Sequence, residues 1–330
     1  MNDLAIPPGV PGQAVPWVRD VTRDAVRHFA WGIGDNNPLW LDADYAEHSP
    51  RQTLLAPPSF AYALHETTVA PGFDERQRIY RGVDWTWFDT IQLGATLTTH
   101  AELIDSVADS SGVYQTGQTT YRDANDGIVA QATTRCLRPN HALNLAREAP
   151  EPKYADAELA SIEQAILGES RRGSEPRTWE ASTVGDPVGP LTKGPLSIMD
   201  IVAWCAGALG APDPDGHHST GGLTEEVATG PQLTAWCAQL LTDWLGDHGF
   251  LHRLRVELVE QPGLGSTTVL QGHVTHRWID GLQHLVQIDF TATGRQQQLV
   301  ATGHAVVALP SREHLVALPP QRLIEFRSAP

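Results

Sequence analysis

Apolar residues recur with helical spacing in three stretches of the chain, which predicts three helices that each bury one face. The first covers residues 22–33 and stops at Gly34, and the second covers residues 58–69 after Pro57-Pro58. Proline suits the first turn of a helix, because the N–H that it lacks has no intrahelical partner there. The third stretch starts at Gly230-Pro231 and is the most regular: Leu233, Trp236, Cys237, Leu240, Leu241, Trp244 and Leu245.

Between residues 78 and 139 the pattern changes to short segments rich in Val, Thr and aromatic residues, separated by Gly, Asp and Asn. Such segments are typical of β-strands, and the loop at 123–127 has the composition of a hairpin turn. The predicted strands are 83–88, 96–104, 112–122 and 128–137. A polar segment, residues 141–180, follows and contains one predicted helix over 156–167.

The first part of the chain repeats after this polar segment. Leu-Gly-Ala-Thr at 93–96 recurs as Leu-Gly-Ser-Thr at 264–267, an offset of 171, and Ile-Val-Ala at 128–130 recurs as Leu-Val-Ala at 299–301 with the same offset. The helix starts at Pro58 and Gly230 differ by 172, and Asp24 matches Asp200 at 176. A duplication indicates two copies of one supersecondary unit. We therefore predict domains at 1–140 and 181–310, a linker at 141–180 and a tail at 311–330.

Composition narrows the classes of partner. The 330 residues carry a formal net charge of -16, which disfavours binding to nucleic acid or to an anionic membrane. We find no apolar run long enough for a transmembrane helix and no signal-peptide pattern. The three cysteines are scattered, with no C-x-x-C pair, so we expect reduced thiols and a cytoplasmic protein.

The turn at 34–38, Gly-Asp-Asn-Asn-Pro, carries the first candidate for chemistry. It would hold the Asp35 carboxylate at the end of one helix, before the start of the next. A carboxylate beside a helix N-terminus, whose free N–H groups can receive an oxyanion, is half of an acid/base site. Alternatively, Asp35 only caps its own turn. His65 would lie on the second helix, in the core or against a pocket.

This stretch resembles the hydratase-2 motif of the MaoC-like dehydratases, the (R)-specific enoyl-thioester hydratases with hot-dog folds. The family pattern is roughly G-D-x-N-P-x-H-x-D-x-x-x-A, followed by a Pro- or Gly-containing helix start. Matching positions are Gly34, Asp35, Asn37, Pro38, Asp42, Ala46 and the run Ala56-Pro57-Pro58. The catalytic His of the family falls on Trp40, which cannot transfer a proton. The resemblance implies an α+β double hot-dog, in which two antiparallel sheets, each wrapped around a central helix, join edge to edge.

The resemblance also implies a function: a hydro-lyase that interconverts 3-hydroxyacyl and 2-enoyl thioesters, carried by coenzyme A or an acyl carrier protein, without a cofactor. Gly230 aligns with the family glycine whose N–H receives the thioester oxygen, whereas Pro58 has no N–H. Trp40 would close the first pocket, in which Asn37 is a candidate substrate-binding residue. The first copy would then bind the acyl chain or only support the fold, and the second copy would hold the chemistry. In the second copy, the direct alignment places no catalytic residue type opposite Asp35 and Trp40. Shifting that alignment by two residues restores the D-x-x-x-x-H spacing, with Asp213 and His218 at its ends and His217 beside His218. A composite site that combines Asp35 with a histidine of the second copy stays open.

Two other functions stay open. The chain is either a repurposed hot-dog of specialised metabolism, such as a cyclase, an eliminating enzyme or a ligand binder, or a non-catalytic subunit beside another hot-dog chain. We expect a homodimer or a hetero-oligomer of hot-dog chains. We expect no metal, because the histidines and carboxylates lack ligand spacing, and no nucleotide, because no glycine-rich phosphate loop occurs. Candidates for contact with an anionic carrier are Arg78, Arg81, Arg253 and Arg255.

Overall fold

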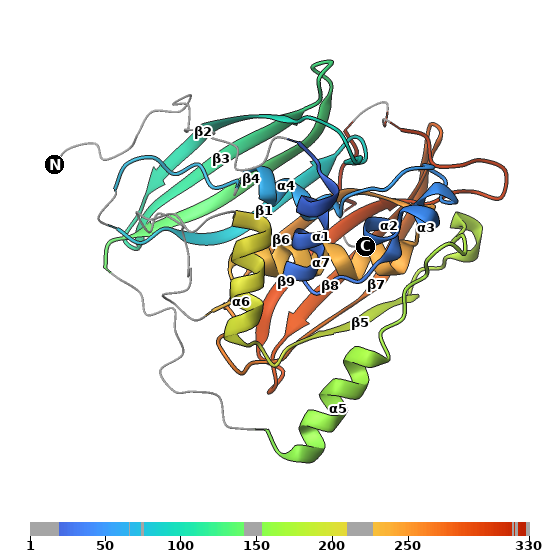
Figure 1. Ribbon diagram of the computed structural model, residues 1–330. Helices are drawn as coiled ribbons and strands as arrows, with labels where there is room; N and C mark the ends of the chain where they lie inside the picture. Colours follow the sequence, from blue (N-terminus) through green and yellow to red (C-terminus); the bar gives the residue numbers. More distant parts are fainter. Residues whose placement is uncertain are drawn as a thin grey trace.

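The computed structural model describes residues 20–65, 67–73, 76–141, 154–209, 227–318, 320 and 323–327. Its centre is one antiparallel sheet of nine strands in the order β2-β3-β4-β1-β6-β9-β8-β7-β5 (Figure 1). The strands are β1 (Ile79–Trp87), β2 (Thr98–Ala108), β3 (Gly112–Arg122), β4 (Ile128–Pro139), β5 (Pro187–Lys193), β6 (Phe250–Leu258), β7 (Thr268–Asp280), β8 (Gln283–Thr293) and β9 (Leu299–Ala308). The four strands expected from the first copy are therefore β1 to β4, and β1 begins at Ile79 rather than Val83.

The sequence repeat is a structural repeat. The starts of β1 and β6 are offset by 171 (250 − 79), and β3 and β8, like β4 and β9, keep the same offset. The first copy supplies β2-β3-β4-β1 and the second supplies β6-β9-β8-β7, with β5 added at the outer edge. The caps of the two entry helices, Thr22 and Ser197, differ by 175, so the predicted offset of 176 there is wrong by one.

The two copies join through β1 and β6, which pair antiparallel. Asp84 lies opposite Arg255, and these residues are themselves equivalent at the offset of 171 (255 − 84). The pseudo-twofold axis therefore passes between them. Asp84 accepts hydrogen bonds from Arg253 Nη2, at 3.0 and 2.8 Å, and from Arg255 Nε at 3.0 Å. Charge pairing thus connects the copies at the axis.

The helices pack against this sheet. The longest is α7 (Gly230–Leu245), and all 16 of its residues are buried, so it is enclosed on every side rather than on one face. The linker helix α5 (Asp156–Leu167) has no buried residue and lies beside the edge strand β5 (Figure 1). The other α-helices are α1 (Arg23–Gly32), α2 (Pro38–Leu41), α3 (Ala43–Glu47), α4 (Ala61–Leu64) and α6 (Ile198–Trp204). None of the helices in the described part of the chain has the length and hydropathy that a membrane crossing needs.

The second predicted helix, over 58–69, is wrong in its C-terminal half. A 3-10 turn, η1 (Pro58–Phe60), leads into α4, which ends at Leu64. His65 is extended (φ -163°, ψ 138°), and Thr67 has a φ of 69°. The His65 Nδ1 atom accepts the Thr67 N–H at 2.9 Å, and Thr134 Oγ1 donates to Thr67 Oγ1 at 2.8 Å. These side-chain bonds replace the helical ones, so neither residue lies on a helix.

Candidate functional site

The motif turn encloses its own carboxylate. Asp35 is fully buried; its Oδ1 accepts the Asn37 N–H at 2.9 Å and its Oδ2 accepts the Trp40 indole N–H at 2.8 Å. Asn37 in turn caps α2, because its Oδ1 accepts the Leu39 N–H at 3.0 Å. Trp40, at the position of the family histidine, therefore engages the carboxylate as a hydrogen-bond donor that cannot exchange a proton with substrate.

Behind the turn lies a group of charges, which we call the junction cluster. It consists of the buried Asp35, Lys193 and Asp243 and the half-buried Glu169 and Arg171. Lys193 Nζ donates to the carbonyls of Ile33 and Gly34 at 2.9 and 3.0 Å. Arg171 Nε lies 3.2 Å from Asp243 Oδ1 and 3.9 Å from Asp35 Oδ1, and Arg171 Nη2 lies 3.6 Å from Glu169 Oε1. The cluster therefore joins the first copy, the linker, β5 and α7.

Burial controls protonation in the junction cluster. It raises the pKa of Asp243 to about 9, and the neighbouring carboxylates of Asp35 and Glu169 raise it further. Burial also raises the pKa of Asp35, against the opposing effect of its bonds from Trp40 and Asn37. Three carboxyl groups face two cations, so one proton on Asp243 makes the cluster neutral, which a buried site favours strongly. We conclude that Asp243 carries that proton at neutral pH.

The structure does not bring Asp35 together with Gly230. Asp35 shares Arg171 with Asp243, which lies two residues before the C-terminal end of α7, whereas Gly230 is the first residue of that helix. At 1.5 Å per residue, 13 residues separate these positions by about 20 Å along the helix axis. Asp35 therefore cannot share a substrate carbonyl with the Gly230 amide in this arrangement.

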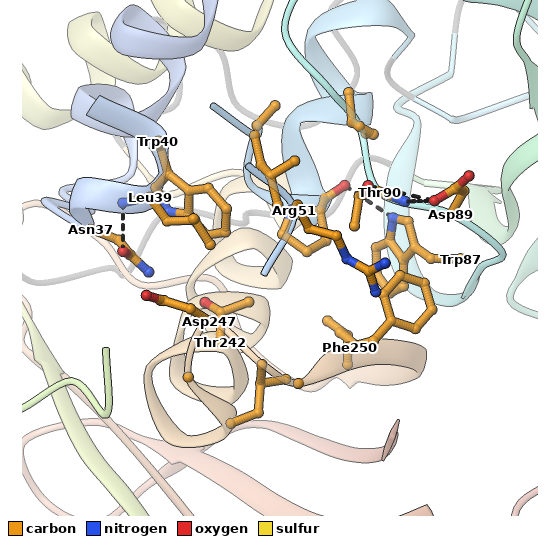
Figure 2. A pocket seen from close by; sticks show the side chains of 18 residues that line it. Asn37, Leu39, Trp40, Arg51, Trp87, Asp89, Thr90, Thr242, Asp247 and Phe250 are labelled. Carbon is orange, nitrogen blue, oxygen red and sulfur yellow. Dashed lines mark hydrogen bonds between the residues drawn. The ribbon is translucent and has the colours of Figure 1, made fainter. Parts of the chain in front are cut away.

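A partly open cavity of about 50 Å³ lies beside the motif turn, between the two copies (Figure 2). Asn37, Trp40 and Pro58 line it, and Asp35 does not. Figure 2 shows Asn37, Trp40 and Asp247 on one side, Trp87 and Phe250 on the other, and Arg51 between them. Most of the wall is apolar: Leu39, Trp40, Leu55, Ala56, Pro58, Trp87, Ile91, Leu245, Phe250 and Leu251.

The two helix starts differ in what they offer an oxyanion. Pro58 has no N–H, and its carbonyl accepts the Trp87 indole N–H at 3.0 Å. Thr229 caps α7 by accepting the Gln232 N–H at 3.2 Å, while the buried Gly230 N–H has no acceptor among the residues that the structure describes. Only glycine fits at position 230, because a Cβ would lie 2.5 Å from Cδ1 of Tyr80.

The remaining predicted site residues fall elsewhere. His65 is buried at the end of α4, and it does not line the cavity. Asp213, His217 and His218 lie outside the described residues. Across the described ranges, no group of three or more His, Cys, Asp or Glu side chains is placed to hold a metal ion.

Sequence reasoning missed the partners of Asp35. Lys193 could have been singled out, because it is one of only two lysines in the sequence and ends an apolar strand. Arg171 stood in the polar linker and Asp243 near the end of the most regular helical stripe, where a carboxylate is unusual among buried positions. Their common location, however, depends on contacts between residues far apart in the chain.

Comparison with known proteins agrees with the architecture. Residues 10–132 match the family model described as FAS1-like, dehydratase domain region. A UPF0336 protein of Streptomyces avermitilis is 24% identical over 128 residues, which are 36% of this chain and 85% of that protein.

The solved structures extend the similarity to nearly the whole chain. A MaoC-like dehydratase superposes with a TM-score of 0.67 at 19% identity, covering 92% of this chain and 97% of the other. A putative MaoC domain dehydratase of Chloroflexus aurantiacus gives 0.62 at 12% identity, with 91% and 95% covered. A conserved hypothetical protein of Mycobacterium tuberculosis, described as a double hotdog fold, gives 0.57 at 12% identity, with 91% and 96% covered. At such identities the similarity shows the fold, and the predicted double hot-dog is confirmed.

Proposed function

We propose that this chain, whose double hot-dog fold is that of the MaoC-like dehydratases, interconverts 3-hydroxyacyl and 2-enoyl thioesters with the chemistry in its C-terminal copy. The observation that carries the proposal is the start of α7: a buried Gly230 N–H without an acceptor in the described part of the chain, at the N-terminus of a long buried helix. Such an amide suits a thioester oxygen that becomes enolate-like, because the helix end favours negative charge.

The N-terminal copy supports the reaction without performing it. The Asp35 carboxylate is buried and bonded to Asn37 and Trp40, so it has no free oxygen to take an α-proton. Pro58 cannot donate to an oxyanion. The acid and the base then come from the second copy, for which Asp213, His217 and His218 are the candidates. The thioester carrier is coenzyme A or an acyl carrier protein.

The test is hydration of crotonyl and longer enoyl thioesters by the purified full-length protein across pH. Asp213→Asn, His217→Ala and His218→Ala are compared singly with wild type, and we expect loss of about 10²–10⁴-fold in kcat for the true acid and base. Asp35→Asn serves as the contrasting variant, for which kcat is retained in the folded fraction. Wild-type protein that hydrates no thioester at any pH refutes the proposal, as does activity that depends on Asp35 alone.

A second candidate function is a non-catalytic partner of another hot-dog chain. The hydrogen bond from the Trp40 indole to Asp35 favours this function, because it gives the motif carboxylate a structural role. In that case the purified chain is inactive alone and co-purifies with a second hot-dog chain. Adding this chain restores the activity of that partner, even when this chain carries the substitutions at 213, 217 and 218.

A further inference from the structure

Tyr80, on β1 of the first copy, packs its ring against the first residue of α7. A Cβ at position 230 would lie 2.5 Å from Cδ1 and 2.8 Å from Cγ of this ring, so the ring fills the space beside the Gly230 Cα atom. At the other helix start, the equivalent residues are Leu251 (251 − 80 = 171) and Pro58 (230 − 58 = 172), and both line the cavity of Figure 2. A tyrosine at this place is therefore specific to the start of α7.

The Tyr80 hydroxyl is held by other buried hydroxyl groups. Its Oη lies 2.8 Å from Tyr62 Oη, which also accepts the Trp85 indole N–H at 3.0 Å. Three threonine hydroxyls lie within hydrogen-bonding range of the Tyr80 hydroxyl as well: Thr67, Thr134 and Thr234. We call these two tyrosines and three threonines the hydroxyl network, and each of them is at most 2% exposed. Burial raises the pKa of Tyr80 to about 12, so its hydroxyl is neutral at pH 7.

The hydroxyl network reaches the backbone of α7 through Thr234. The Thr234 Oγ1 atom donates to the Gly230 carbonyl at 2.9 Å, and its hydroxyl lies within hydrogen-bonding range of both tyrosines. Gly230 is thus held at its Cα atom by the Tyr80 ring and at its carbonyl by Thr234. Glycine has more conformational freedom than any other residue, so a glycine amide that must keep one direction needs such contacts from outside.

We propose that Tyr80 positions the Gly230 amide for the thioester oxygen, with its ring against the Cα atom and its hydroxyl fixed by the hydroxyl network. This inference rests on the proposed function, because it concerns the amide that was assigned there to the oxyanion. Tyr80 is a positioning residue, since it acts through Gly230 and its hydroxyl points into the protein interior. A donor that is held in place before the reaction needs no reorganisation in the transition state.

The kinetic test uses Tyr80→Phe in the full-length protein, which keeps the ring and removes the hydroxyl. We expect kcat for crotonyl thioester to fall about 10–100-fold with KM unchanged, because a displaced donor is missed in the transition state. Thr234→Val should have a similar effect, and the double variant should lose no more than the larger single effect, because members of one network do not act additively. Tyr121→Phe is the matched control: it removes the hydroxyl of another fully buried tyrosine, which donates to the His65 carbonyl at 3.2 Å, and should keep the wild-type kcat.

Hydrogen exchange measures the restraint without any substrate. The first turn of α7 contains the Gln232 N–H, bonded to Thr229 Oγ1 at 3.2 Å, and the Leu233 N–H, bonded to the Thr229 carbonyl at 3.0 Å. In Tyr80→Phe these amides should exchange faster than in wild type, whereas amides at the other end of α7, residues 242–245, should not change. A general loss of stability would accelerate both ends, so this comparison separates local loosening from global unfolding.

The results also separate this inference from the proposed function. Active wild-type protein whose kcat and first-turn exchange are the same in Tyr80→Phe as in Tyr121→Phe overturns the role of Tyr80 and leaves the proposed function standing. Single effects that multiply in the double variant overturn the hydroxyl network as one unit. Wild-type protein that hydrates no thioester overturns the proposed function and the thioester role of Gly230 together, and the exchange rates then decide whether Tyr80 restrains the first turn.

Discussion

Replacement of Asp243 by Asn tests the proton assigned to the junction cluster. Asn has the shape of a protonated Asp, so near pH 4, close to the unfolded pKa of 3.8, the two proteins should have unfolding free energies within about 1 kcal/mol of each other. The difference should appear as the pH rises. In wild type the pKa of Asp243 moves from 3.8 in the unfolded chain to about 9 in the fold, so folding takes up one proton between these values.

The sign and the size follow from linkage. A carboxyl whose pKa is raised by folding costs no stability below its unfolded pKa, because both states then hold the proton. Above that value folding must take up a proton, so the unfolding free energy falls with each pH unit until the folded pKa is reached. One proton corresponds to about 1.4 kcal/mol per pH unit. Between pH 6 and pH 8 the wild type should therefore lose about 2.7 kcal/mol of unfolding free energy relative to Asp243→Asn, because Asn has no proton to take up at this position.

Urea denaturation at pH 6, 7 and 8, followed by tryptophan fluorescence, measures both free energies. Asp105→Asn removes an exposed carboxylate on β2 and makes the same change to the formal charge of the sequence, and its curve should stay parallel to wild type. If Asp243→Asn also runs parallel to wild type, within the scatter of about 0.5 kcal/mol typical of neutral surface substitutions, Asp243 is ionised in the fold and our charge balance is refuted.

Three further predictions concern single sites. Trp40→Phe should lower the unfolding free energy by about 1.5–3 kcal/mol in urea titrations, because Asp35 Oδ2 loses its donor while remaining buried; no measurable change would contradict this. Gly230→Ala should cost about 1–3 kcal/mol by the same measurement, since the added Cβ lies 2.5 Å from the ring of Tyr80. His252 is buried with its pKa lowered to about 4, so its NMR signals should not titrate until well below pH 6.5, and the stability that its neutral ring contributes should be lost as the pH falls from 6.5 toward 4.

The sequence predicted the parts of the fold that depend on local pattern. The regular stripe over 233–245 and its glycine boundaries defined α7 closely, and the repeated segments located the equivalent strands of both copies. The failure at residues 65–69 has a physical cause. Thr67 and His65 are held by Thr134 on β4 and Tyr121 on β3, and such long-range bonds override a helical pattern that is only a few turns long.

The candidate site was predictable only in part. Spacing identified Asp35 and left two roles open, a catalytic base and a turn cap, and its bond to the Asn37 N–H is that of a cap. The indole of Trp40 could have been considered as a donor, since it lies on the short helix that directly follows the turn. The cations that balance Asp35 come from the linker and from β5, far along the chain from the motif, so no local pattern connects them.

The pair at the pseudo-twofold axis has a consequence for the history of this chain. If two copies of the first half assembled through β1 in the same register, Asp84 would meet Asp84; two copies of the second half would set Arg255 against Arg255. Each homotypic assembly places like charges face to face, and only the mixed one is complementary. The two copies have thus diverged at this position, and the pairing of their edge strands favours one copy of each kind.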